Sequence, residues 1–202
     1  MSLWVAASPP VLASKSAVRR SVLEAAGIPV EVSSADIDER GVEANARLDD
    51  AGMVASLLAR EKARTVAAKI PERIVIGADQ TLSLDGRRFS KPADRSAARD
   101  QLMALSGRTH ELHAAIAVWH GGRVAFEHVD VARLTMRRLS AEFLDAYLTA
   151  AGSAVSDSVG AYQLEKLGIQ LFDRVEGDHF TILGLPLLPL LAYLRRQGSL
   201  AA

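Results

Sequence analysis

The sequence predicts an α/β protein in which a mixed β-sheet is flanked by helices. Two long β-prone runs are separated only by His120-Gly121-Gly122, a pattern typical of an antiparallel hairpin. Shorter apolar runs alternate with segments of helical periodicity, which is typical of βα units with parallel strands. Together these patterns favour a mixed sheet over a purely parallel one. No repeat, low-complexity tract or linker divides residues 1–202, so we expect one domain.

Local signals place the elements of the first half of the chain. They predict a strand near 11–12, a helix ended by Gly27, a strand over about 29–33, a helix over about 53–69 and a strand over about 74–79. We expect the polar segment 36–50 to be an exposed loop. The last strand should end near Gly77 and carry Asp79 at its tip, before a hairpin at Asp85-Gly86.

The second half is read in the same way. It predicts a helix over about 94–105 capped by Asp94, strands over about 109–119 and 123–137, a helix from Ser140 to Gly152, two short strands within 168–184 and a final helix with Pro186 in its first turn.

Composition excludes several classes of protein. The 24 basic and 24 acidic residues balance, so no global field attracts nucleic acid and any phosphate must be recognised locally. The absence of cysteine excludes disulfides, thiolate metal sites and a cysteine nucleophile. No charged leader precedes the first apolar stretch, and the longest apolar run, 182–194, is shorter than the about 20 residues of a membrane span. We expect a cytoplasmic protein with neither nucleic acid nor membrane as partner.

Asp79 and Lys91 are the first candidate site residues. A carboxylate at the end of a buried strand, with a lysine returned near it by a hairpin, is a common arrangement for holding Mg²⁺ and a polyphosphate. Asp38-Glu39 and Lys62 could extend such a site. The alternatives are that Asp79 merely begins a turn and that the acidic segment is solvated.

The segment from Ser14 to Arg20 is a second candidate. Hydroxyls and backbone N–H groups at the start of a helix bind anions, and Arg19 can fork onto a phosphate. The segment is not a P-loop, because it lacks Gly-Lys-Ser/Thr. The alternative is that Ser16 caps the helix while Arg19 and Arg20 are solvated.

The remaining motifs carry weaker signals. His110 follows a helix stop, where a histidine is more often structural, and the histidines show no spacing typical of zinc ligands. A glycine-containing loop beside Tyr162 could hold a nucleobase. The segment Gly184-Leu185-Pro186-Leu187 reads as ordinary helix initiation.

In their order, these motifs resemble the Maf-type nucleoside triphosphate pyrophosphatases, also called septum-formation-like proteins. The resemblance extends from Leu12 to Leu194. It rests on Leu12-Ala13-Ser14-Lys15-Ser16 with Arg19, Asp38-Glu39, Ile76-Gly77-Ala78-Asp79, Lys91-Pro92, Ser106-Gly107-Arg108-Thr109-His110, Gly160-Ala161-Tyr162 and Gly184-Leu185-Pro186-Leu187.

The chain also departs from the family pattern. Ala17 replaces a usual proline, and Ser158 replaces a lysine expected in the dTTP/UTP branch. Gln80 and Glu165 resemble residues of the branch of 7-methyl-GTP pyrophosphatases. The preferred base, a modified purine or thymine and uracil, therefore stays open.

The resemblance implies an elongated, often dimeric Maf/ITPase-like fold with a central nucleotide cleft. It implies hydrolysis of a nucleoside triphosphate to a monophosphate and pyrophosphate, removing modified or surplus nucleotides. Asp79 would be the general base and a ligand of Mg²⁺, or of Mn²⁺ in its place, with Glu39 as a second ligand. The other implied substrate-binding residues are Ser14, Ser16, Arg19, Lys62 and Lys91 for the triphosphate and Glu165 for the base.

Two functions from other classes compete with this reading. One is a non-enzymatic nucleotide-binding regulator of cell division, which would not require Asp79 beside Lys91. The other is a phosphatase of small metabolites, which would release inorganic phosphate instead of pyrophosphate.

Overall fold

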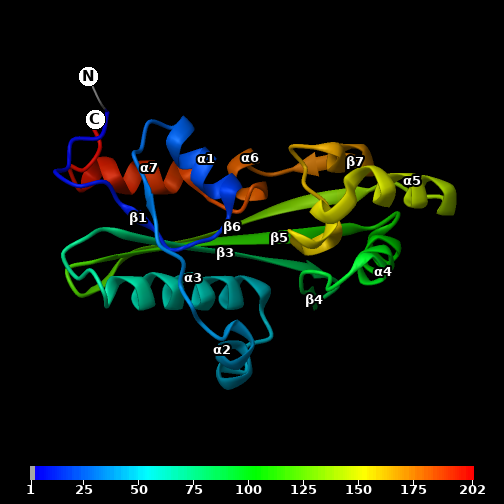
Figure 1. The fold of residues 1–202 in the computed structure, drawn as a ribbon, viewed down its shortest axis with the longest axis horizontal. Coiled ribbons are helices and arrows are strands. Elements are labelled where there is room, and N and C mark those ends of the chain that lie inside the picture. Colours follow the sequence, from blue (N-terminus) through cyan, green and yellow to red (C-terminus); the bar gives the residue numbers. More distant parts are fainter. Residues whose placement is uncertain (1–2) are drawn as a thin grey trace.

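A computed structural model describes residues 3–202, whose strands form one seven-stranded mixed sheet in an elongated molecule (Figure 1). The order is β2-β1-β3-β5-β6-β7, with β4 paired to β3. β1 is parallel to β2 and β3, and the other pairs are antiparallel. The strands are β1 (Val11–Leu12), β2 (Glu31–Val32), β3 (Val75–Leu84), β4 (Arg87–Phe89), β5 (Thr109–His120), β6 (Arg123–Met136) and β7 (Phe172–Glu176).

Helices cover both faces of the sheet. α3 lies along one face, α1 and α7 lie on the other, and α4 and α5 cover the far end (Figure 1). The helices are α1 (Ala17–Ala25), α2 (Glu39–Ala46), α3 (Ala51–Ala67), α4 (Arg95–Leu105), α5 (Ala141–Ala151), α6 (His179–Ile182) and α7 (Leu187–Arg196). Three short 3₁₀ segments are η1 (Gly152–Ser156), η2 (Val159–Ala161) and η3 (Leu167–Leu171).

The alternation of β3 decides which side chains meet which helices. Val75 packs with the alanines of α3, whereas Ile76 and Ala78 pack on the opposite face with Leu23 of α1 and Leu190 of α7. Successive side chains of a strand point to opposite faces, so Asp79 shares the α3 face and Gln80 the other. Further along, Leu82 joins a third apolar cluster under α4 and α5.

One edge of β3 is open at its middle. On that side β1 pairs only with Val75 and Ile76, and β4 pairs only with Leu82 to Leu84. Asp79 lies between these two pairings, opposite Ala115 of β5. The prediction that Asp79 ends a strand is therefore wrong, because the long antiparallel register with β5 carries the strand past Gly77.

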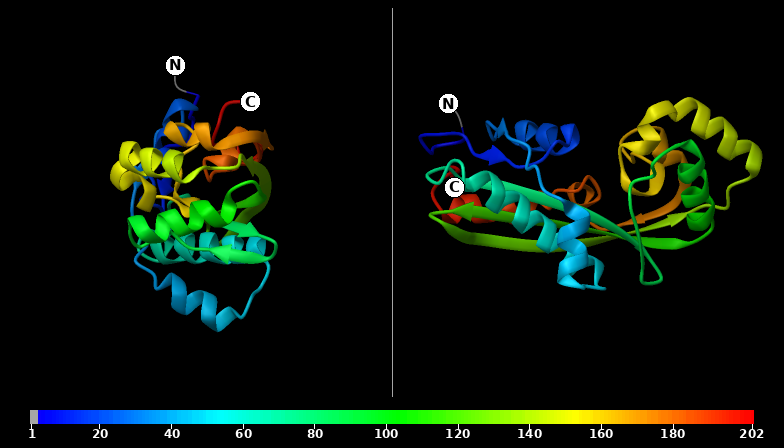
Figure 2. Two further views of the ribbon diagram at one scale, coloured as in Figure 1. Left: turned by 90° about the vertical axis from the view of Figure 1, so that its right-hand side faces the viewer. Right: turned by 60° about the horizontal axis from the view of Figure 1, so that its bottom comes forward.

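Two further expectations are corrected. The segment 36–50 is not all loop: Asp38 caps α2 by accepting from the Gly41 N–H, although no residue of α2 is buried. Figures 1 and 2 show α2 standing away from the sheet. Of the two short strands expected within 168–184, only β7 forms. Asp178 caps α6 there by accepting from the Thr181 N–H.

Most other elements are confirmed near their expected bounds. Asp94 caps α4, Ser140 caps α5, Gly152 ends α5 and Pro186 precedes α7. β5 and β6 flank a turn at 121–122, within the turn predicted over 120–122, and His120 is the last residue of β5. Within residues 3–202, the structure contains no helix that is both long and apolar enough to cross a membrane.

Candidate active site

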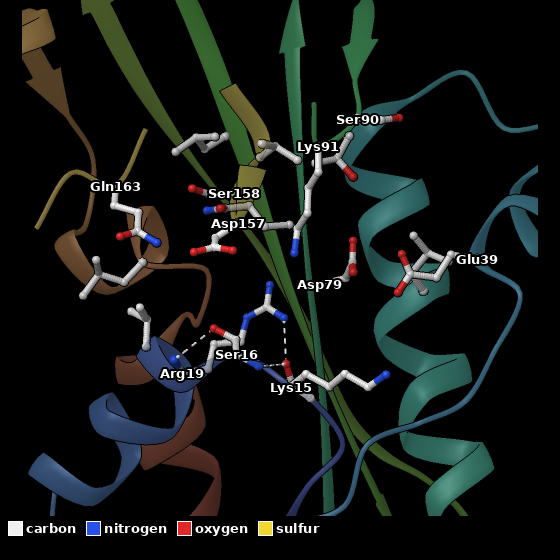
Figure 3. Close-up of a pocket in the computed structure, with 18 of the residues that line it drawn as sticks. Lys15, Ser16, Arg19, Glu39, Asp79, Ser90, Lys91, Asp157, Ser158 and Gln163 are labelled. Atoms are coloured by element: carbon white, nitrogen blue, oxygen red, sulfur yellow. Dashed lines mark hydrogen bonds between the residues drawn. The ribbon is translucent and has the colours of Figure 1, made fainter. Parts of the chain in front are cut away.

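A cavity of about 880 Å³ lies over the open edge of β3. This size falls within the range of small-molecule sites. Its lining comes from residues 13–19, from α2 and the turn before it, from α3, from 79–81 and 88–91, from parts of 156–166, and from 182–183. Figure 3 shows labelled side chains from these separate segments converging on the same space. Segments far apart in the sequence therefore build one cavity.

Gly77 sets how closely α3 approaches β3. A β-carbon at Gly77 would lie 2.0 Å from the carbonyl oxygen of Ala59 and 2.8 Å from the amide nitrogen of Ala63. Only glycine allows the helix backbone this near the strand. Lys62, three residues beyond Ala59, is thereby placed beside Asp79, two residues beyond Gly77 on the same face.

Lys62 lies between two carboxylates. Its ammonium is 2.5 Å from Oδ1 of Asp79 and 2.7 Å from Oε1 of Glu39. Asp79 is buried, and Glu39 approaches from the exposed helix α2. Burial raises the pKa of the Asp79 carboxyl, while the positive charges of Lys62 and Arg19 act in the opposite direction. The sequence-predicted residues Asp79, Lys62 and Glu39 are thus in contact.

The carboxylate pair fits a divalent cation that arrives with a phosphate ligand. Oxygens of Asp79 and Glu39 already converge on a single positive charge, that of Lys62. Mg²⁺ is typically held by one or two carboxylates together with substrate phosphates and water. Residues 3–202 contain no group of three or more acidic, histidine or cysteine side chains that could hold a metal by themselves.

Arg19 is fixed at the start of α1 with its guanidinium in the cavity. Its Nε donates to the carbonyl oxygen of Gly184 at 2.8 Å, and its Nη1 donates to Ala78 O at 2.8 Å and to Ser14 Oγ at 3.2 Å. Burial lowers the pKa of Arg19, opposed by the charges of Asp79 and Glu39, yet arginine stays protonated in proteins. Figure 3 shows the guanidinium directed into the cavity.

The two readings of this segment are thereby resolved. Ser16 does cap α1, because its Oγ accepts from the Arg19 N–H at 3.3 Å. The expectation that both arginines would then be solvated is wrong for Arg19. It is right for Arg20, which is exposed and pairs with Glu24 one turn later on α1.

Lys91 and Glu165 also line the cavity. Lys91 is exposed, follows β4 and extends into the cavity toward Asp79 in Figure 3. Glu165 is exposed and lies two residues after Gln163 in the same segment. Oε1 of Gln163 is buried and has no hydrogen-bond partner among the described residues. The phosphate-side candidates and Glu165 therefore share one cavity.

Gln80 and the pair Arg88–Glu43 were not predicted to shape this site. Nε2 of Gln80 donates to the carbonyl oxygens of Thr181 and Ile182, both at 3.0 Å, and so fastens α6 to β3. Arg88 Nη1 lies 2.9 Å from Glu43 Oε2 and ties β4 to α2. The identity of Gln80 was visible in the sequence, but its partners are about a hundred residues away and left no local signal.

His110 and His113 make contacts within the protein and do not line the cavity. Nε2 of buried His110 lies 2.7 Å from the hydroxyl of Tyr162, and burial lowers the pKa of His110 to about 4. His113 contacts Ser83 and Glu111, but both contacts use Nε2. A nucleophile relay requires both ring nitrogens of the histidine, so this trio does not form one.

A cavity that gathers Arg19, Lys62 and Lys91 around a buried carboxylate defines an α/β protein suited to a polyanionic ligand. The model of the family of Maf-like proteins matches residues 9–197, and the chain belongs to this family.

Full-length relatives carry names from nucleotide chemistry. A nucleoside triphosphate pyrophosphatase of Nitrobacter winogradskyi is 59% identical over 201 residues, covering 100% of both chains. One of Bradyrhizobium diazoefficiens is 56% identical over the same length, also covering 100% of both chains. A 7-methyl-GTP pyrophosphatase of Rhizobium etli is 50% identical, covering 94% of this chain and 96% of its own.

Similarity to solved structures is weaker. A HAM1 protein from Coxiella burnetii aligns with a TM-score of 0.42 and 16% identity, covering 65% of this chain and 74% of its own. The family assignment rests on the sequence relatives instead.

Proposed function

We propose that the protein hydrolyses nucleoside triphosphates to nucleoside monophosphates and pyrophosphate. The observation that carries this proposal is the Asp79–Lys62–Glu39 contact in a cavity that also receives Arg19 and Lys91. The names of the full-length relatives support it. Removal of modified or surplus nucleotides is the role that such an activity would serve.

Asp79 supplies the base for the attacking water. Its carboxylate accepts a proton from water while the water oxygen bonds to phosphorus. The anhydride bond between the α- and β-phosphates then breaks, and pyrophosphate leaves. A buried carboxylate with a raised pKa is a stronger base than a solvated one.

Positive charge on the cavity wall stabilises the phosphate oxygens. Arg19 is pre-oriented by its bonds to Ala78 and Gly184, and Lys91 reaches the same space from the other side. Such fixed charges supply most of the catalysis of phosphoryl transfer. Ser14 and Ser16 accept hydrogen bonds through Oγ, which leaves each hydroxyl proton free for a phosphate oxygen.

Asp79 and Glu39 are the residues that would hold Mg²⁺, or Mn²⁺ in its place. When bound, the metal would neutralise charge on the phosphate oxygens. The protein contributes two carboxylates, so the remaining ligands would be water and phosphate.

The base-binding end of the cavity lies around Glu165. Apolar side chains of Val159, Leu164 and Leu183 line the cavity too and could pack on the faces of a base. A carboxylate accepts hydrogen bonds from the N1–H and N2–H₂ groups of guanine, whereas thymine and uracil offer a single N3–H. We therefore propose a modified purine such as 7-methyl-GTP over dTTP or UTP, and one relative carries that name.

The test is a substrate panel with separate detection of pyrophosphate and inorganic phosphate. The purified protein is incubated with Mg²⁺ and dTTP, 7-methyl-GTP or each common ribonucleoside triphosphate, with Asp79→Asn as the control. We expect pyrophosphate from wild type alone. Nucleotide binding without any product would favour the regulator, and inorganic phosphate as the first product would favour the phosphatase.

Assembly and location stay predictions of this proposal. A homodimer is checked by light scattering of the purified protein. A cytoplasmic location is expected because nucleotide pools are cytoplasmic, and fractionation of cells checks it.

A further inference from the structure

We propose that Lys62 excludes free divalent cations from the site, so that a metal ion binds only together with the triphosphate. The identity of this anionic ligand rests on the proposed function. The exclusion itself rests on the contacts of Lys62, whose ammonium lies 2.5 Å from Asp79 Oδ1 and 2.7 Å from Glu39 Oε1. These carboxylates are the two that fit a metal ion.

The charges of the cluster already balance without a metal. Asp79 and Glu39 supply two negative charges, and Lys62 and Arg19 supply two positive ones. A free divalent cation would have to take the place of the Lys62 ammonium between the two carboxylates. The ammonium would still be nearby, and burial strengthens the repulsion between the two positive charges. Mg²⁺ also gives up its water reluctantly. Entry of the metal alone is therefore unfavourable.

Arg19 cannot relieve this repulsion by moving away. Its Nε and Nη1 are bonded to the carbonyl oxygens of Gly184 and Ala78 in the protein interior. Lys62 is different, because its ammonium ends a flexible stem that reaches the cavity. Of the two cations, Lys62 is the one that can change partners.

A triphosphate removes the conflict. Its negative charges compensate the added metal, and its oxygens give the displaced ammonium new acceptors. Glu39 can adjust its position to the metal, because α2 has no buried residue that anchors it in the core. The ion pairs Lys62–Glu39 and Arg88–Glu43 connect α2 to neighbouring elements. Lys62 would thus exchange carboxylate for phosphate as the metal and nucleotide enter together.

The test measures Mn²⁺ binding by electron paramagnetic resonance, with and without an α,β-methylene nucleoside triphosphate that cannot be cleaved. For wild type we expect weak binding of Mn²⁺ alone and binding at least about tenfold tighter with the analogue. Lys62→Met should bind Mn²⁺ alone at least about tenfold more tightly than wild type does, because the carboxylates lose their internal cation.

Lys91→Met is the matched control. It removes the same charge from the same cavity, but Lys91 has no ion pair with a carboxylate among the described residues. Its Mn²⁺ affinity without nucleotide should stay within about threefold of wild type. If Lys62→Met does not fold, Lys62→Gln provides the comparison, since its amide can still donate to Asp79.

Two results would overturn the proposal. One is wild type binding Mn²⁺ equally tightly with and without the analogue. The other is Lys62→Met binding Mn²⁺ alone no more tightly than Lys91→Met. Pyrophosphate release by wild type is measured separately. If wild type released no pyrophosphate, the proposed function would be refuted. The Mn²⁺ affinities of wild type, Lys62→Met and Lys91→Met measured without nucleotide would still test the role of Lys62.

Discussion

Nη1 of Arg19 donates to the carbonyl oxygen of Ala78 at 2.8 Å, one residue before Asp79 on the open edge of β3. The preceding carbonyl on this edge, that of Ile76, is bonded to the Ala13 N–H instead. Arg19 therefore takes over from β1 as hydrogen-bond donor to the strand edge. The Arg19 side chain thus provides the hydrogen bond that the buried carbonyl of Ala78 needs, and the absence of a strand at this position leaves room for the cavity beside Asp79.

Replacement of Arg19 should consequently affect both stability and catalysis. Arg19→Ala leaves Ala78 and Gly184 without a donor, so the free energy of unfolding in urea should fall by roughly 2 kcal/mol. kcat/KM should also fall, and Arg19→Lys should restore it only in part because lysine lacks the planar fork. Arg20→Ala should change stability by less than about 0.5 kcal/mol and leave activity intact. Equal effects at the two arginines would contradict the assignment.

Asp79→Asn should remove activity while preserving the fold. The amide keeps the volume of the carboxylate but cannot accept a proton, so kcat should fall by at least about 10²-fold. Lys62 keeps Glu39 as a partner, and the amide oxygen can still accept from its ammonium, but Lys62 and Arg19 then face one carboxylate instead of two. The unfavourable burial of the charged Asp79 is removed at the same time, so the protein should stay folded with only a moderate fall in the free energy of unfolding in urea. Turnover within a few-fold of wild type would remove Asp79 from the mechanism.

Gly77→Ala should separate α3 from β3. The added β-carbon meets backbone atoms, which cannot rotate away, so we expect a loss of about 3 kcal/mol in unfolding free energy. Activity should fall as well, because Lys62 moves with the helix. Gly121→Ala is the control: Gly121 has a positive φ but open space around it, so only backbone strain of about 1 kcal/mol acts. Similar losses in the two variants would show that close packing is not the cause.

His110 should make stability depend on pH. The pKa of His110 is about 4 in the folded state and 6.5 in the unfolded chain, so between these pH values the unfolded chain binds a proton and the folded chain does not. Stability from this residue is present above pH 6.5 and is lost as the pH falls toward 4, by up to about 3 kcal/mol. His110→Gln can still bond Tyr162 but cannot titrate. Urea unfolding of both proteins should diverge across this range, and parallel curves would refute the prediction.

Glu165→Gln tests the choice of base. The carboxylate accepts from the guanine edge, whereas the amide also presents donors that oppose N1–H and N2–H₂. The ratio of kcat/KM for 7-methyl-GTP over dTTP should fall, with pyrophosphate as the product in both cases. A wild-type protein that already prefers dTTP and UTP would refute the purine assignment and leave the reaction itself unaffected.

Local patterns predicted most of the elements correctly. Capping residues such as Asp94 and Ser140, and the glycine turn at 121–122, act over a few residues, so their effects are readable in the sequence. A local pattern gave a wrong prediction where tertiary pairing overrode it. Gly77 resembles a strand end, but the pairing of β3 with β5 continues through it. The glycine instead permits close packing of α3.

The sequence by itself determined the residue types of the candidate site, the mixed α/β class and the family resemblance. It could separate Arg19 from Arg20 only as a hypothesis about helix faces. Only the tertiary structure decided that Arg19 is half-buried and bonded to Ala78 and Gly184, and that Lys62 lies between Asp79 and Glu39. These contacts join segments distant in the chain, and their geometry depends on how closely helix and strand backbones pack, which no local pattern of residues specifies.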